Sequence, residues 1–176
     1  MGYGFRGNPW TKTGPMVDHT FFSSQGLFAY TDSTMGTTGS KTLMVTPSMS
    51  CIGSQCCMEF YYHMYGQGMG TLNIYIRQPI FGDILVDTIG GESLGSQWRR
   101  YRTTISPINP QDGVFQIVFE GIRSYAPAII AIDDVAVFQE SCPKEPTVRT
   151  LPYTCNFTMD MCGMYSSRKD GNVSFS

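Results

Sequence analysis

Charged side chains, long apolar runs and helix-like periodicity are scarce in this chain, and each scarcity excludes a class of protein. Asp, Glu, Lys and Arg make up 15% of the 176 residues and leave a formal net charge of -2, so no broad basic field is available for nucleic acid. The longest apolar run, residues 126–132, is too short to span a bilayer. No window of helical length keeps an i, i+3, i+4 apolar stripe free of Gly and Pro, so we expect little helix.

Catalytic motifs are also missing. The chain has two histidines, and His19 beside Asp18 lacks the G-x-S-x-G elbow or other nucleophile motif that a Ser-His-Asp mechanism needs. No H-E-x-x-H sequence occurs, and Gly66–Gly70 lacks the Lys-Ser/Thr of a phosphate-binding loop. The one dense basic spot, at 99–102, is interpreted as the solvated side of a strand. We therefore expect no enzymatic activity and no nucleic-acid partner.

Several segments of the chain alternate between apolar and polar residues with a period of two. The run Cys57–Gly66 alternates, glycines follow at 66, 68 and 70, and a second alternating run covers Thr71–Arg77, which together predict a hairpin. Further strands are expected at 27–30, 42–45, 83–89, 98–105, 114–120 and 129–138. About eight strands with almost no helix predict an all-β fold, a two-sheet antiparallel sandwich of the jelly-roll type.

The chain contains six cysteines: Cys51, Cys56, Cys57, Cys142, Cys155 and Cys162. An even count in a loop-rich β chain favours disulfides and hence an oxidising compartment. Six cysteines allow 15 pairings, so the cysteine count alone leaves the pairing open. Zinc bound by the first three cysteines and His63 is disfavoured, because the adjacent Cys56 and Cys57 point to opposite faces of a strand.

Secretion and a modular parent protein are indicated at both ends of the sequence. Sequons at Asn156 and Asn172 are acceptor sites for N-glycosylation and agree with passage through the secretory pathway. The first residues have no signal-peptide pattern, so the secreted composition predicts a piece of a larger protein. We expect one domain over 1–142, a Pro-containing linker over 143–154 and the start of a new unit over 155–176, in an extracellular or cell-surface location. The parent protein can be membrane-anchored.

A set of anchor residues in fixed order resembles the MAM domain, the extracellular module of meprins, neuropilins and receptor tyrosine phosphatases. The matching elements are Thr13-Gly14-Pro15, Asp18-His19-Thr20, Gly26–Tyr30, Leu43–Pro47, Cys57–Gly66, Gly70–Leu72, Trp98, Phe115–Gly121, Ile130–Val135 and Cys142. They cover nearly all of residues 10–142. Cys155-Asn156-Phe157 with Cys162-Gly163 resembles the opening of a second MAM domain. The first domain lacks its own opening cysteine pair, so we expect its N-terminal strand to be truncated.

The resemblance implies a jelly-roll sandwich with disulfides Cys57–Cys142 and Cys155–Cys162. It does not account for Cys51 and Cys56, which either close a small local loop or pair outside the sequence. The resemblance also implies a bound cation, commonly calcium, with Asp18 and Asp133 as ligands. Adjacent aspartates on a regular strand face opposite ways, so at most one of Asp133 and Asp134 is expected to bind it. The alternative is that these carboxylates only accept backbone N–H bonds.

Two function classes follow from the resemblance. The first is an adhesion or interaction module of a multidomain MAM-repeat protein, which binds an extracellular protein or an identical MAM domain. Its contact surface is expected to use exposed aromatics such as Tyr62, Tyr65 or Tyr75 with arginines at the rim. The second is a non-catalytic accessory domain that helps a secreted or membrane-anchored enzyme to fold, oligomerise or meet its substrate. The apparent tandem repetition favours adhesion.

Overall fold

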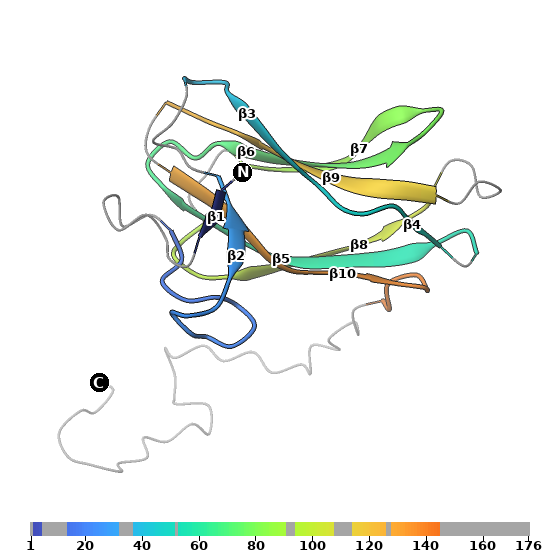
Figure 1. Ribbon diagram of the computed structural model, residues 1–176, viewed down its shortest axis with the longest axis horizontal. Coiled ribbons are helices and arrows are strands. Elements are labelled where there is room, and N and C mark those ends of the chain that lie inside the picture. Colours follow the sequence, from blue (N-terminus) through green and yellow to red (C-terminus); the bar gives the residue numbers. More distant parts are fainter. Residues whose placement is uncertain are drawn as a thin grey trace, which may run out of the picture. The chain divides into compact units, whose positions relative to one another are not determined.

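All regular structure that the computed structural model describes is β-strand (Figure 1). The described residues are 2–4, 14–31, 37–51, 53–90, 94–107, 114–125 and 128–144. The chain divides into two units, Met1–Cys142 and Pro143–Ser176, and the strands all belong to the first. In chain order the strands are β1 Gly2–Gly4, β2 Phe28–Tyr30, β3 Lys41–Val45, β4 Met49–Ser50, β5 Cys56–Gly66, β6 Thr71–Gln78, β7 Gly82–Gly90, β8 Arg99–Ile105, β9 Val114–Ile122 and β10 Ala128–Phe138. No membrane-spanning helix is found in this described part of the chain.

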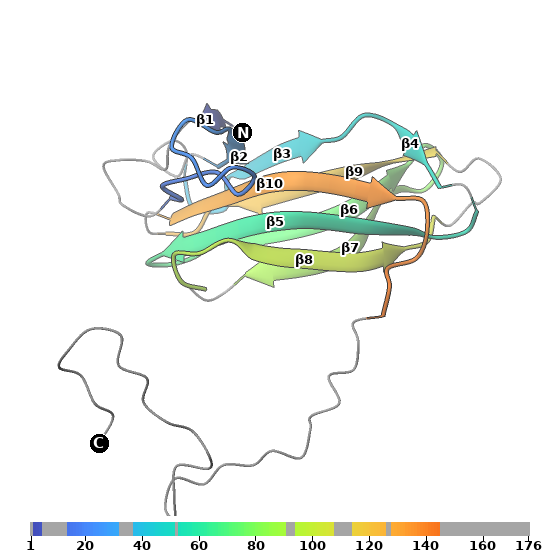
Figure 2. The ribbon, with the colours of Figure 1, turned by 90° about the horizontal axis from the view of Figure 1, so that it is seen from below.

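The strands form two antiparallel sheets that pack face to face. The first sheet has the order β1-β2-β10-β5-β8; the second has the order β3-β9-β6-β7, and β4 pairs with β9. Figure 2 shows the first sheet in front of the second. Between them the rings of Phe60 on β5 and Phe119 on β9 meet edge to face, with centroids 5.0 Å apart. The all-β, two-sheet jelly-roll sandwich expected from the sequence is thus confirmed.

Alternation places every second side chain of the central strands in one core. On β6, Leu72, Ile74 and Ile76 are buried, whereas the residues between them are partly exposed. The facing strand β5 contributes Met58 and Phe60 in the same way. Full burial of such side chains contributes about 1.5–3 kcal/mol each, so the alternating pattern itself fixes which face of each strand points inward.

The prediction that Cys57–Arg77 forms a hairpin is wrong. β5 lies in the first sheet and β6 in the second, so the chain crosses from one layer to the other and β6 instead pairs with β7. Gly66 and Gly68 take positive φ of 142° and 69° in this crossing. At Gly70 an added Cβ would lie 2.0 Å from the carbonyl oxygen of Ile122, so only glycine fits. The glycines therefore permit a tight inter-sheet passage rather than a two-strand turn.

β10 is irregular where its two aspartates lie. Its pairing with β5 shifts register between Asp133 and Ala136, and Asp134 has a φ of 50°. A bulge of this kind re-aims side chains on a strand. The expectation that Asp133 and Asp134 face opposite ways assumed a regular strand, and the bulge removes that assumption. Both carboxylates contact the same loop, residues 14–27.

Candidate interaction site

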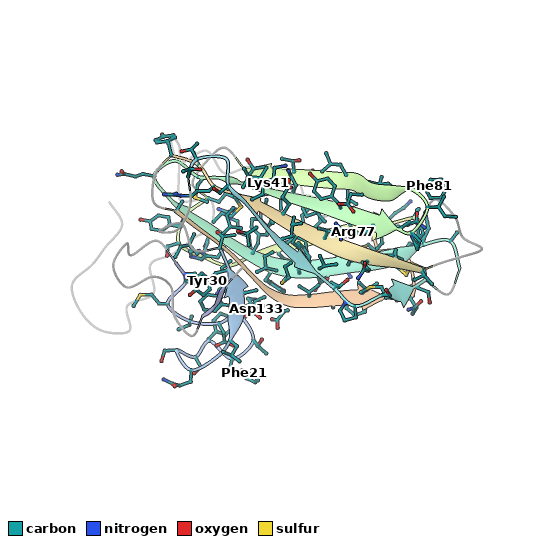
Figure 3. The ribbon with its side chains drawn as sticks, turned by 45° about the horizontal axis from the view of Figure 1, so that its top comes forward. Phe21, Tyr30, Lys41, Arg77, Phe81 and Asp133 are labelled. Carbon is teal, nitrogen blue, oxygen red and sulfur yellow. A yellow bond between two sulfur atoms is a disulfide. The ribbon has the colours of Figure 1, made fainter. Side chains whose placement is uncertain are left out.

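The loop that precedes β2 exposes an unusual amount of apolar surface. We call residues 14–27 the aromatic loop. Met16, Phe21, Phe22 and Leu27 expose 83%, 78%, 69% and 59% of their surface, and Phe21 projects from the domain in Figure 3. Single exposed apolar residues are common, but four of them within one loop are a concentration that is typical of interaction sites.

Asp18 holds the aromatic loop from inside. It is only 1% exposed, and its carboxylate accepts the backbone N–H groups of Phe21 and Ser23 at 2.8 Å each. The backbone of Asp18 also donates to the carbonyl of Ser23 at 3.1 Å, which closes the turn. Gly26 packs so closely that an added Cβ would lie 2.0 Å from the Asp18 carboxyl carbon. The loop is therefore built around one buried carboxylate.

His19 ties the aromatic loop to the outer face of the first sheet. Its backbone N–H donates to the Asp133 carboxylate at 2.8 Å, its ring Nδ1 lies 2.6 Å from a carboxylate oxygen of Asp134, and its ring stacks on Tyr61 with centroids 3.4 Å apart. Thr20 donates to the other oxygen of Asp134 at 2.6 Å. These contacts join the loop to β10 and β5 at several points.

The two β10 carboxylates differ in their electrostatics. Partial burial raises the pKa of Asp134, but the hydrogen bonds from His19 and Thr20 outweigh it and keep that pKa below its ordinary value. Burial raises the pKa of Asp133, the nearby Asp134 and Asp18 charges raise it further, and two backbone N–H bonds oppose the shift without cancelling it. Asp134 is thus the charged partner of His19.

A second small core supports the aromatic loop from beneath. Phe28, Ile129 and Ala131 form it, with Trp98 packed against them. The Trp98 ring donates its N–H to the carbonyl of Val17 at 2.9 Å and so fixes the loop backbone. The loop therefore rests on a packed apolar base on the outer face of the first sheet.

His63 is buried in this same region. It is 1% exposed, its ring lies edge-on to Trp98 with centroids 5.7 Å apart, and neither ring nitrogen is hydrogen bonded to another described residue. Burial accordingly lowers the pKa of His63 to about 4. At neutral pH it is an uncharged packing group.

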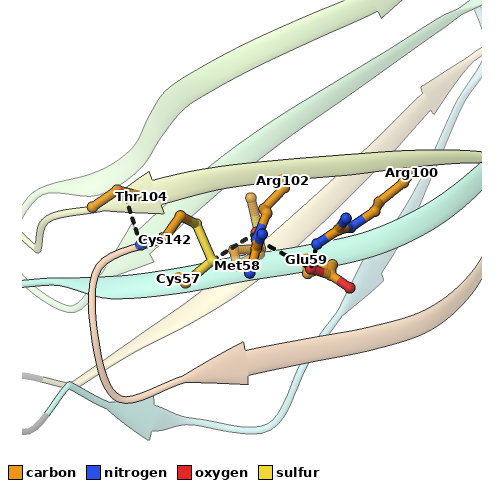
Figure 4. The surroundings of a disulfide bond; sticks show 7 residues. All are labelled: Cys57, Met58, Glu59, Arg100, Arg102, Thr104 and Cys142. Carbon is orange, nitrogen blue, oxygen red and sulfur yellow. Dashed lines mark hydrogen bonds and ion pairs between the residues drawn. A yellow bond between two sulfur atoms is a disulfide. The ribbon is translucent and has the colours of Figure 1, made fainter. Parts of the chain in front are cut away.

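Two of the three arginines of β8 form ion pairs with a carboxylate on the neighbouring strand, and the third, Arg99, donates to the carbonyl of Leu94. Glu59 on β5 forms ion pairs with Arg100 at 2.8 Å and Arg102 at 3.2 Å. Figure 4 shows the three side chains on the outer face beside the Cys57–Cys142 disulfide. The interpretation of the basic spot as the solvated side of a strand holds for Arg100, which is exposed, whereas Arg99 and Arg102 are half-buried. Glu59, Arg100 and Arg102 also form a polar border on the face of the first sheet that carries the aromatic loop.

Two disulfides are present in the described residues. Cys57 bonds Cys142, the pair that the family resemblance implies, and the backbone N–H of Cys142 donates to Thr104 on β8 at 3.0 Å (Figure 4). Cys51 bonds Cys56 and closes the small local loop that was one of the two alternatives. Cys56 faces the core and Cys57 the outer face, as neighbours on a strand must.

Several expected site residues lie outside the described residues. These are Cys155, Cys162, Asn156 and Asn172, so the second disulfide and the two glycosylation sites stay predictions.

The aromatics expected at the contact surface are placed differently. Tyr62 packs against the core, and Tyr75 is partly buried with its hydroxyl donating to Glu120 at 3.1 Å. Of the three tyrosines expected at the surface, Tyr65 alone is exposed. The expectation that Tyr62 is an exposed contact residue is therefore wrong, and the sequence analysis missed Phe21 and Phe22. A pair of adjacent phenylalanines between Asp18 and Gly26, outside any alternating run, was the signal that could have revealed them.

The two expected calcium ligands, Asp18 and Asp133, lie close enough for the charge of Asp18 to raise the pKa of Asp133. Calcium takes six to eight oxygens. In the described ranges no three His, Cys, Asp or Glu side chains form a ligand set. The four oxygens of Asp18 and Asp133 also each accept a backbone N–H. The described residues alone do not fit a calcium site, and the cation stays a prediction.

A hydrolytic centre at His19 lacks its nucleophile. His19 and Asp134 are hydrogen bonded as in a catalytic dyad, but no Ser, Thr or Cys side chain in the described part of the chain is hydrogen bonded to the His19 ring. The stacking on Tyr61 and the loop contacts instead give His19 a structural task. Catalysis needs a nucleophile within hydrogen-bond reach of the base, and this geometry does not supply one.

A disulfide-closed β-sandwich with a rigidly held apolar loop defines an extracellular type of module. The sequence profile of the family described as MAM domain, meprin/A5/mu, matches residues 5–143. The chain belongs to the MAM domain family. It is an extracellular or cell-surface module, as its relatives are.

The curated relatives are much longer than this chain. MAM domain-containing glycosylphosphatidylinositol anchor protein 1 of Gallus gallus is 34% identical over 77% of the chain and 14% of its own length. Neuropilin-1a of Danio rerio is 33% identical over 83% of the chain and 16% of its own length. Thyroid hormone-induced protein B of Xenopus laevis is 31% identical over 85% and 21%. None of the three is named for an enzymatic activity.

Solved structures give weaker likenesses. One is the TmCBM61 complex with beta-1,4-galactotriose, with a TM-score of 0.44 and 15% identity, covering 65% of this chain and 70% of that one. Another is the K3 cleaved adhesin domain of Lys-gingipain from Porphyromonas gingivalis, with a TM-score of 0.46, 13% identity and coverage of 66% and 76%.

Proposed function

We propose that this MAM domain is a non-catalytic recognition module of a multidomain extracellular protein and that the aromatic loop contacts the partner protein. The observation that carries the proposal is the combination of exposure and anchoring at Phe21 and Phe22. Their rings are largely exposed, yet Asp18 and His19 fix the backbone on either side. Rings that are already held in place lose little entropy on binding, which is the usual property of binding hot spots.

The chemistry of the loop favours a protein partner. It carries no Lys or Arg, so it lacks the basic residues that attract anionic membrane surfaces. The nearby Arg100 is paired with Glu59. An apolar centre bordered by paired charges is the usual layout of a protein–protein interface.

The test is a binding screen with matched variants. The full chain, multimerised to raise avidity, is applied to an array of purified extracellular ectodomains, and the affinity of each hit is then measured with Phe21→Ala and Phe22→Gly. We expect each variant to weaken binding at least ~10-fold, or about 1.4 kcal/mol. Phe81→Ala is the control, because Phe81 is also exposed but lies well away from Phe21 in Figure 3.

Two outcomes would contradict the proposal. One is binding that depends on Phe81 and not on Phe21 or Phe22. The other is binding of the wild-type chain to phosphatidylcholine or phosphatidylserine vesicles, with no binding to any ectodomain. The second outcome would assign the aromatic loop to a membrane surface.

A further inference from the structure

The strand β3 is an edge of the second sheet: among the described residues, no strand pairs with the side of β3 that faces away from β9. Thr46 donates to the carbonyl of Ile117, and Arg123 donates to that of Ser40, so the even-numbered residues at this end of the sheet form the hydrogen-bonded pairs with β9. Hydrogen-bonded and non-hydrogen-bonded pairs alternate along an antiparallel ladder. Lys41, Leu43 and Val45 therefore direct their N–H and C=O groups away from β9.

A groove runs beside this edge, between the two sheets. It has a volume of about 610 Å³. Its walls include Met44, Thr46 and Met49 from the β3–β4 side, Val135 and Val137 from β10, and Gln139 just after it. β2 pairs with β10 only at Ala131 and Ile132, so the later part of β10 is also unpaired on this side among the described residues. Figure 2 shows β3 and β4 along this side of the sandwich, next to β10.

The β3 edge differs from the other edges in its charge. Natural edge strands are protected from pairing by charged side chains. The opposite edge, β7, carries Asp83 and Asp87, and the edge strand β8 of the other sheet carries three arginines. β3 has a single charged residue, Lys41, which is neutralised by Glu120 at 3.1 Å.

The exposed face of β3 is apolar apart from that lysine. Leu43 and Val45 are exposed on it, and Val135 is exposed on the groove side of β10. An unguarded, apolar edge with no unpaired charge is self-complementary, because two copies can approach there without like-charge repulsion.

We propose that β3 pairs antiparallel with β3 of a second copy of this chain, about a two-fold axis at Leu43. Leu43 then faces its own counterpart in a hydrogen-bonded pair, and Lys41 faces Val45 of the second copy. This isologous contact joins the two second sheets into one continuous sheet, and the two apolar grooves close against each other. The contact does not involve the aromatic loop, which stays available to a different protein.

A cysteine cross-link reports the register directly. Residues in a hydrogen-bonded antiparallel pair have Cα atoms about 5.5 Å apart, within the range of a disulfide. We expect oxidised full chain with Leu43→Cys to run as a covalent dimer on a non-reducing gel. Leu85→Cys is the matched control, since Leu85 is an equally exposed leucine on the β7 edge of the same sheet. No cross-link at Leu43, or equal cross-linking at both positions, would overturn the proposed pairing.

Equilibrium sedimentation of the full chain measures the association itself. We expect a concentration-dependent dimer, a dissociation constant raised at least ~10-fold by Leu43→Lys, and no change with Leu85→Lys or Phe21→Ala. Circular dichroism melts of the variants show whether each is folded, and Leu43→Pro is the second variant because it removes an outward N–H without touching the β9 ladder. A monomer at all concentrations up to about 1 mM, or a dimer lost through Phe21→Ala, overturns the proposal.

Discussion

Phe22 and Asp134 both hold left-handed backbone conformations, with φ of 51° and 50°, and both contact the ring of His19. Apart from glycines, they are the two residues with positive φ in the described part of the chain. Such conformations cost an L-residue roughly 1–2 kcal/mol and persist where surrounding contacts impose them, often at functional sites. Both strained residues therefore contact His19, the residue that joins the aromatic loop to the first sheet.

Replacing Phe22 by glycine separates stability from binding. Glycine adopts a φ near 50° without steric cost, although its greater freedom in the unfolded chain offsets part of that gain. We expect Phe22→Gly to leave the free energy of unfolding within about 1 kcal/mol of wild type. Partner binding should still fall, because the exposed ring is gone. A large loss of stability in urea unfolding would show that the ring is structural.

The buried carboxylate of Asp18 makes the loop sensitive to Gly26. In Gly26→Ala the new methyl group collides with that carboxylate and breaks its bonds to the N–H groups of Phe21 and Ser23. We expect these two amides to exchange hydrogen at least ~10-fold faster while the β6 amides keep their protection. Ser24→Ala, an exposed change in the same loop, is the control. Unchanged exchange at Phe21 in Gly26→Ala would show that the loop is held by other contacts.

The two disulfides should differ in their contribution to stability. Cys57–Cys142 spans a sequence separation of 85 and Cys51–Cys56 one of 5. Loop-closure entropy gives about 4.5 kcal/mol for the long loop and about 2 kcal/mol for the short one. We expect the Cys57→Ala/Cys142→Ala variant to lose more unfolding free energy in guanidinium than Cys51→Ala/Cys56→Ala. The reverse order would mean that native-state packing, rather than chain entropy, dominates.

Acid should destabilise the domain partly through His63. Its pKa is about 4 in the folded protein and close to 6.5 in the unfolded chain, so the unfolded state binds the proton first. The stabilisation from neutral His63 is complete above pH 6.5 and is lost as the pH falls toward 4. The shift corresponds to on the order of 3 kcal/mol.

The check is the pH dependence of urea unfolding in the wild type and in His63→Phe. We expect the wild type to lose stability relative to His63→Phe between pH 6.5 and 4. Parallel curves for the two proteins would show that His63 is not the titrating group. Carboxylates with lowered pKa, such as Asp134, lose their contribution at lower pH in both proteins.

Most strands were predictable because each is a run of alternating or continuous apolar residues. The expected run at 114–120 became β9, Val114–Ile122, and the run at 129–138 became β10, Ala128–Phe138. The short strands β1 and β4 were missed; they consist of Gly-Tyr-Gly and Met-Ser, which lack the run of apolar residues that marked the equally short β2. Alternation also gives no information on which sheet a strand joins, and this is why β5 and β6 were wrongly paired.

The candidate site was only partly predictable. Asp18 and Asp133 were singled out from the family resemblance, and the structure places them around the same loop. The role of His19 depends on the bulge in β10 and on a cross-strand stack with Tyr61. Both are tertiary features between residues more than 40 positions apart, and one sequence without relatives does not encode them visibly.

The bond between Cys57 and Cys142 has a mechanical consequence. Cys142 lies just after the last strand, and its sulfur is attached to β5, a strand with neighbours on both sides. A pull on the chain beyond Cys142 is therefore transmitted covalently to the middle of the sheet, and it does not unzip β10 one hydrogen bond at a time. The hydrogen bonds of β5 to both of its neighbours then resist the pull together, in a shearing geometry.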